Sequence, residues 1–176
     1  MNPTNSSKGY TFIELTVVIF LIGLTLVLTV PKFRYAMLTD DLKATVRRMV
    51  ATVRTLRNEA IRKQEIYTLH FDLESNRFWM ESGGMTDEGR ELAYEKAFQL
   101  PQGVRILDVW SRARGKKADG KAIVHFTKKG YIEQSAIHLA ADDGREFSLV
   151  LSPFLGKVKV FEKYVEFERL GISTTY

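Results

Sequence analysis

The sequence of 176 residues contains no cysteine and only three histidines. Without cysteine the chain has neither a disulfide framework nor thiol chemistry, so its stability must come from a buried hydrophobic core, which this length permits. His70, His125 and His138 are far apart, and none is spaced like the paired histidines of a zinc enzyme. We interpret them as side chains on the faces of strands and expect no metal site.

Motifs for catalysis or cofactor binding are also missing. Gly83-Gly84 is not followed by the Gly-Lys-Ser/Thr of a phosphate-binding loop. Asp72 with Glu74, and Asp142 with Asp143, lack the alternating oxygen ligands of a calcium loop, and we interpret them as turn residues. We therefore expect no catalytic residues, no cofactor and no enzymatic activity.

Charge is almost absent from one stretch near the start of the chain. The residues from Ile13 to Val30 are almost wholly apolar, with Glu14 as the exception at their front edge. A helix of this length measures roughly 27 Å, close to the hydrocarbon thickness of a bilayer. The run is longer than the apolar core of a cleaved secretory signal, and it ends at Pro31 without a small-residue cleavage site. We expect a helix that can span a membrane, in which the acid Glu14 has a function.

The helical pattern continues past Pro31, which is expected to kink the helix without ending it. Apolar residues four and three positions apart predict one stripe, formed by Leu42, Val46, Met49, Val53, Leu56 and Ala60. Lys43, Arg47 and Arg54 predict a basic ridge beside the stripe. A free coiled coil is the alternative, but the heptads are few and no flanking charge pattern supports it.

A helix from Tyr10 to Gln64 would be roughly 80 Å long, which no compact domain of this size needs. We therefore expect its front half to lie among lipids or other subunits and its rear half to pack on the rest of the chain.

After Gln64 the sequence changes to short alternating segments separated by Gly, Asn and Asp, which indicates strands. Ile66 to Leu73 and Arg77 to Glu81 flank the hairpin loop Glu74-Ser75-Asn76, in which Asn tolerates a positive φ. Ser82 to Arg90 and Ser111 to Gly120 are predicted loops. The remaining predicted strands are residues 104–110, 122–126, 135–139, 146–151 and 157–160. The fold class is α+β, with a mostly antiparallel β body.

The segment Gly9-Tyr10-Thr11-Phe12-Ile13-Glu14-Leu15 resembles the class III signal of type IV pilins and type II secretion pseudopilins. A short polar leader ends at Gly9, an aromatic residue follows, and Glu14 is the fifth residue counted from Tyr10. Pro31 falls where helices of this family commonly kink. The family usually begins with Phe, so Tyr10 is a departure that keeps an aromatic ring.

The resemblance implies a pilin-like fold in which a long N-terminal helix, membrane-spanning in its first half, packs on an antiparallel β-sheet or sandwich head. The implied organisation is a leader (1–9), a transmembrane and filament-core helix (10–30), its amphipathic continuation (31–64) and a β-rich head (65–176). A prepilin peptidase would cleave after Gly9 and methylate the new amine of Tyr10.

In this family Glu14 would pair with the terminal amine of a neighbouring subunit. Such an amine is largely cationic at neutral pH, and pairing offsets part of the cost of burying the carboxylate. The other interpretation is an ordinary acid at a helix start, which the helix dipole favours by about 0.3–1 kcal/mol.

Four further fragments are similar to GspH/FimT-type minor pilins: Arg57 to Gln64, Leu100 to Val104, His125 to Gly130 and Leu155 to Val158. They imply a minor pseudopilin near the tip of the periplasmic pseudopilus in type II secretion. Such a subunit is a single-pass protein of the bacterial inner membrane with its head in the periplasm. Its implied partners are the assembly platform of that membrane and the other pseudopilins of a hetero-oligomeric filament. The alternative is a minor type IV pilin used for adhesion, motility or DNA uptake.

The net charge of +5 raises the possibility of nucleic-acid binding. Residues 1–64 hold ten Lys and Arg against four Asp and Glu, or +6, whereas residues 65–176 hold sixteen against seventeen, or −1. The best local candidates for phosphate contact are Arg112, Arg114, Lys116 and Lys117. We interpret this cluster as a solvated loop and expect no nucleic-acid partner.

Overall fold

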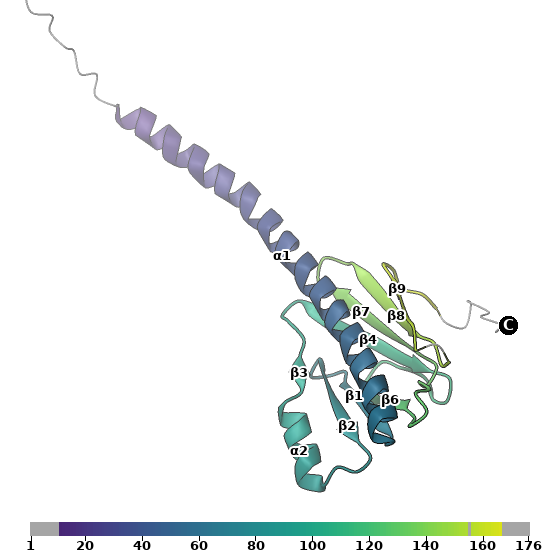
Figure 1. Cartoon of the computed structure of the whole chain (residues 1–176). Helices are drawn as coiled ribbons and strands as arrows, with labels where there is room; N and C mark the ends of the chain where they lie inside the picture. Colours follow the sequence, from purple (N-terminus) through teal and green to yellow (C-terminus); the bar gives the residue numbers. More distant parts are fainter. Residues whose placement is uncertain (1–10, 155, 167–176) are drawn as a thin grey trace, which may run out of the picture. The chain divides into compact units, whose positions relative to one another are not determined.

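The computed structural model describes residues 11–154 and 156–166, with the backbone alone for 26–40 (Figure 1). Close contacts divide the chain between Met37 and Leu38 into two units. Helix α1, Phe12–Lys63, contributes to both. Within the described residues, no helix combines the length and the apolarity that a membrane crossing requires. The membrane-spanning role of residues 10–30 therefore stays a prediction.

Helix α1 is close to the expected span from Tyr10 to Gln64. It ends where Gln64 adopts a left-handed backbone conformation with φ of 55°. The backbone is helical through Pro31, as expected for a proline that does not end the helix, and the kink there stays a prediction. All six residues of the predicted apolar stripe are buried, none more than 6% exposed, so the rear half of α1 docks on the head.

The head contains two antiparallel sheets, which confirms the predicted β body. The first has the strand order β3-β2-β1-β6, and its strands are β1 Tyr67–Asp72, β2 Arg77–Ser82, β3 Phe98–Gln99 and β6 Lys121–Phe126. The second has the order β5-β4-β7-β8-β9, and its strands are β4 Val104–Ser111, β5 Gly115–Lys117, β7 Ser135–Ala141, β8 Glu146–Leu151 and β9 Val158–Phe161. One face of each sheet joins the stripe of α1 in a single hydrophobic core.

The predicted hairpin between β1 and β2 is confirmed. Asn76 has the positive φ expected of it, 48°, and its side-chain oxygen also accepts a hydrogen bond from the backbone N–H of Ile106 at 2.9 Å. Along β1 the apolar residues Leu69 and Phe71 are buried in the core, whereas His70 lies on the opposite face. The alternation predicted for this strand is therefore correct.

Two predicted loops contain regular structure, so both predictions were wrong in part. The stretch from Ser82 to Arg90 leads into helix α2, Asp87–Glu95, whose start is capped by Thr86 accepting from the N–H of Gly89. Figure 1 shows α2 beside β2. Within Ser111 to Gly120, the strand β5 pairs with the end of β4 as a short hairpin. No residue of α2 is buried, and all three residues of β5 are exposed, so neither element contributes a side chain to the core.

Candidate assembly surfaces

The first turn of α1 positions Glu14 through a capping interaction. The hydroxyl of Thr11 accepts a hydrogen bond from the N–H of Glu14 at 3.3 Å, and its carbonyl accepts from Leu15 at 3.2 Å. Threonine before a helix and glutamate three residues later form the capping-box pattern, which the sequence reasoning had overlooked. Gly9 and Tyr10, the predicted cleavage and methylation residues, lie outside the described residues. Within the part that is described, the exposed Glu14 carboxylate has no ion-pair partner, so it is free to bind a cation.

The helix surface that follows Glu14 is apolar and exposed. The large hydrophobic side chains from Phe12 to Leu24 are between 45% and 86% exposed. The hydroxyls of Thr16 and Thr25 donate to the backbone carbonyls of Phe12 and Leu21, at 2.9 and 2.7 Å, so these polar groups are satisfied within the helix. An apolar surface of this extent marks a site of contact with other proteins or with lipid.

The basic cluster from Arg112 to Lys117 lies on the β4–β5 hairpin. Arg112 donates to the side-chain oxygen of Gln134 at 3.3 Å. Arg114 donates to the carbonyl of Ile123 at 3.0 Å and forms an ion pair of 3.5 Å with Glu133. These cations therefore already have partners within the head, and a phosphate would have to compete with them.

The third cation of the cluster, Lys116, joins a buried polar network. Its ammonium group donates to the hydroxyl of Tyr164 at 2.8 Å and lies 3.4 Å from the carboxylate of Asp108. The Tyr164 hydroxyl in turn donates to Asp108 at 3.0 Å. Nδ1 of His138 lies 2.6 Å from the other oxygen of Asp108, and these two side chains are only 2% and 3% exposed. Lys117, the fourth cation, is exposed.

The network pins the last described segment of the chain onto the second sheet. The Tyr164 ring stacks on His138 at 4.1 Å, and Nε2 of His138 lies 3.1 Å from the carbonyl of Val165. The hydroxyl of Ser148 donates to the carbonyl of Lys163 and accepts from the N–H of Val165. The two ring nitrogens of His138 therefore face oxygen atoms on both sides, Asp108 at Nδ1 and Val165 at Nε2.

A β-bulge creates this pairing. The register of β4 against β7 shifts between Ile106 and Asp108, so that Val109, and not Asp108, joins the core with Ile106. Asp108 is thereby turned to the outer face, opposite His138. Burial raises the pKa of Asp108, but the hydrogen bonds and charges of His138, Tyr164 and Lys116 outweigh burial, and the pKa is lowered.

The other two histidines lie on the first sheet. Nε2 of His70 lies 3.3 Å from the Glu81 carboxylate, its ring stacks on Trp79 at 5.1 Å, and burial lowers its pKa. Nδ1 of His125 lies 3.2 Å from the hydroxyl of Thr68. In residues 11–154 and 156–166, no group of three or more His, Asp and Glu side chains is arranged to hold a metal ion.

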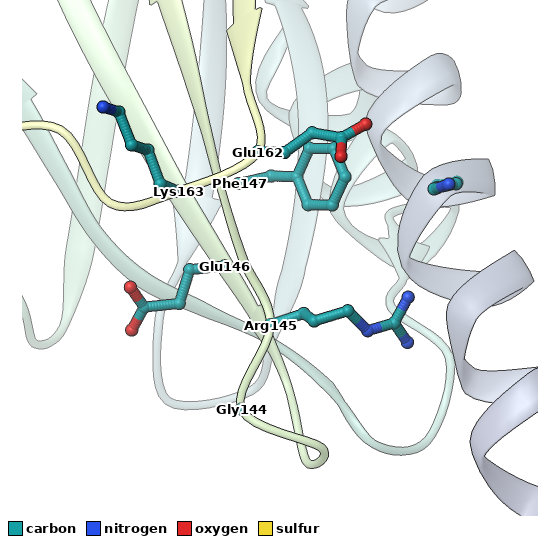
Figure 2. Close-up of a pocket in the computed structure, with 7 residues that line it drawn as sticks. Gly144, Arg145, Glu146, Phe147, Glu162 and Lys163 are labelled. Atoms are coloured by element: carbon teal, nitrogen blue, oxygen red, sulfur yellow. The ribbon is translucent and has the colours of Figure 1, made fainter.

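Hollows open on the described part of the head, and two of them are lined in part by residues of α1. Figure 2 shows one of about 470 Å³, where charges of both signs from α1, the β7–β8 turn and the segment after β9 surround Phe147. Its Arg145 is already bound by Asp143. The other hollow, of about 260 Å³, lies between α1, β2 and α2; it contains Phe78 and Met80, and Arg48 and Lys96 contribute cations. The residues that line these two hollows include no serine, cysteine or histidine.

No protein-family model matches the sequence, and no curated protein matches it. Two solved structures of the minor pseudopilin EpsH, from the type II secretion system of Vibrio cholerae, are similar in fold. One has a TM-score of 0.53 and 11% identity, and the similarity covers 72% of this chain and 97% of that one. The other has a TM-score of 0.53 and 10% identity, and covers 72% and 99%. The chain therefore has a GspH-type pseudopilin fold, which agrees with the sequence fragments that resemble that group.

Proposed function

We propose that this chain is a minor pseudopilin, a structural subunit of the periplasmic pseudopilus of a type II secretion system. The observation that carries the proposal is the combination of a GspH-type fold with a leading helix whose apolar side chains from Phe12 to Leu24 are exposed. Burying that surface among the helices of other subunits would stabilise a filament by roughly 25 cal/mol per Å² of apolar area removed from water, and by van der Waals packing where the helix leaves lipid.

In this proposal the chain starts as a single-pass protein of the inner membrane with its head in the periplasm. A prepilin peptidase cleaves after Gly9 and methylates the amine of Tyr10, and the assembly platform transfers the subunit to the filament. Glu14 then pairs with the amine of a neighbouring pseudopilin. The capping bond from Thr11 supports this role, because it fixes the first turn of the helix and leaves the Glu14 carboxylate exposed.

The chain acts in this account through contacts and not through catalysis. The polar groups of the Asp108–His138–Tyr164 network bind one another and the backbone, so they stabilise the head. The engagement of Arg112, Arg114 and Lys116 within the head argues against nucleic acid as a partner. A minor type IV pilin remains the alternative, and the operon that encodes the chain, for secretion or for a pilus, distinguishes the two.

Processing at Gly9 is the direct test of the proposal. We expect an intact-mass measurement on the chain from its own cells to give a polypeptide that begins with N-methylated Tyr10. The variant Gly9→Ala should retain Met1, whereas the matched variant Gly23→Ala, which lies in the helix with open space around it, should be processed normally. A native chain that retains Met1, or a Gly9→Ala chain cut like the wild type, would contradict the proposal.

A further inference from the structure

Two aromatic side chains stand exposed on the head, away from the polar network. Tyr131 is 45% exposed and Phe154 is 70% exposed. Their rings contact each other edge to face, with the centroids 5.6 Å apart and the planes at 77°. We call Tyr131 and Phe154, together with the neighbouring Lys128 and Lys129, the aromatic corner. Exposed aromatic rings that touch form an apolar patch of the kind that provides interface hot spots.

Backbone hydrogen bonds hold the aromatic corner rigid. In the turn before Tyr131, the N–H of Thr127 donates to the carbonyl of Tyr131 at 2.9 Å, and the N–H of Gly130 donates to the carbonyl of Thr127 at 2.8 Å. The N–H of Ile132 donates to the carbonyl of Pro153 at 3.2 Å, which ties this turn to the segment that carries Phe154. The backbone that carries the two rings is thus fixed within the head, which lowers the conformational entropy that binding would cost.

Side chains of helix α1 contact the same turns. Nε of Arg57 donates to the carbonyl of Gly130 at 3.0 Å. Gly130 and Gly156 both have positive φ, and a Cβ on either would come within 3 Å of the side chain of Ile61 or of Arg57, respectively. The two glycines therefore let the turns lie directly on the helix. The turns that carry the aromatic corner are therefore packed directly against helix α1.

The charge beside the rings is positive. Lys128 and Lys129 lie in the same turn as Tyr131, and both side chains are exposed. Among the described residues, neither ammonium group has a carboxylate within ion-pair distance, and no acidic residue lies between Thr127 and Ile132. A surface that binds here must accommodate two rings and complement two adjacent cations.

We propose that the aromatic corner is a docking site for a different protein, whose surface offers an apolar recess with carboxylates at its rim. This inference rests on the proposed function, according to which the partner is a neighbouring subunit of the same filament. The rings fill the recess, and Lys128 and Lys129 pair with the acidic rim. The partner is thus selected by shape and by the sign of its charge.

Two other occupants fit the aromatic corner less well. The apolar hollow of a second copy, at Phe78 and Met80, also contains Arg48 and Lys96, whose charges would repel the two lysines. Single-stranded nucleic acid binds by stacking successive bases on ring faces. In the aromatic corner the edge of one ring is turned toward the face of the other, so the two faces are not parallel as stacked bases would require. Residues 65–176 also have a net charge of −1, which does not favour the binding of phosphates.

Photo-cross-linking of the full chain in its own cells tests this proposal. Phe154 is replaced by p-benzoylphenylalanine, and Met80, another exposed apolar residue, receives the same replacement as the matched control. We expect adducts from position 154, and few from position 80, with one protein other than this chain. Sequencing of the cross-linked peptide should place apolar residues beside Asp or Glu at the point of attachment.

Charge variants sharpen the test. Lys128→Glu with Lys129→Glu should reduce the adduct from position 154 by about tenfold or more, since like charges across an interface cost kilocalories per mole. Lys128→Arg with Lys129→Arg should leave it unchanged, and thermal unfolding should show that both double variants keep the stability of the wild type. Adducts with the chain itself or with nucleic acid, equal yields from positions 80 and 154, or a yield insensitive to charge reversal would overturn the inference. If the chain is still processed at Tyr10 in those cases, the proposed function survives without it.

Discussion

The two halves of helix α1 differ in how their apolar surfaces are covered. From Phe12 to Leu24 the large hydrophobic side chains are at least 45% exposed, whereas the stripe from Leu42 to Ala60 is at most 6% exposed. The rear stripe packs against the inner faces of the two sheets of the same chain. Within the described residues the front half has no such cover, and this difference is what the proposed filament accounts for.

The carboxylates of the head and of the leading helix differ in the same way, in whether their partners come from the same chain. Asp108 in the head is bound by His138, Tyr164 and Lys116, all from the same chain. At the start of α1, the backbone N–H of Glu14 is bound by Thr11, and its carboxylate has no ion-pair partner among the described residues. Asp108 is therefore neutralised within the head, whereas the proposed function supplies a partner for Glu14 only in the filament.

The largest expected effect comes from removing a carboxylate that binds several groups within the head. Asp108→Asn removes the carboxylate that His138, Tyr164 and Lys116 share, and should lower the free energy of unfolding by about 3–5 kcal/mol, since each hydrogen bond to a charged group contributes about 1.5–3 kcal/mol. Chemical unfolding of the full chain in detergent measures this change. Asp119→Asn, at an exposed position, is the control and should change stability by less than about 0.5 kcal/mol. Equal stability of the two variants would show that the network does not hold the head together.

The next effect compares the two halves of α1 directly. Leu56→Ala removes a buried side chain from the core and should cost about 2–5 kcal/mol. The same truncation at the exposed Leu21 should leave the unfolding of the head unchanged, because no core is disturbed. Parallel unfolding curves under identical conditions provide the measurement. A large loss of head stability in Leu21→Ala would mean that the front half is also covered within the chain.

The smallest effect concerns pH. Burial lowers the pKa of His70 in the folded head, so the unfolded chain, with its ordinary pKa of about 6.5, binds the proton first as the pH falls. Stability should therefore decrease from about pH 6.5 down to the folded-state pKa, opposed in part by the attraction of Glu81. His70→Gln should reduce this slope, and unfolding midpoints across the range would show it. A variant with the slope of the wild type would contradict the assignment.

The sequence predicted the elements that have a strong apolar period. The stripe of α1 and the hairpin at Asn76 needed only spacing and turn chemistry. Helix α2 was missed because none of its residues is buried, although Thr86 followed by two acids is a helix-start signal. The pairing of Asp108 with His138 was not predictable, because strict alternation points Asp108 into the core until the bulge in β4 turns it outward.

The most direct test of the central claim compares two acids of the same helix. Glu14→Ala removes the carboxylate that has no partner in the described chain, and Glu59→Ala removes one that pairs with Arg62. Both variants should fold, with heads as stable as the wild type to within about 0.5 kcal/mol, since both positions are on the surface. We predict that Glu14→Ala is missing from sheared filament fractions while Glu59→Ala is recovered in them. Incorporation of Glu14→Ala at the level of the wild type would contradict the account.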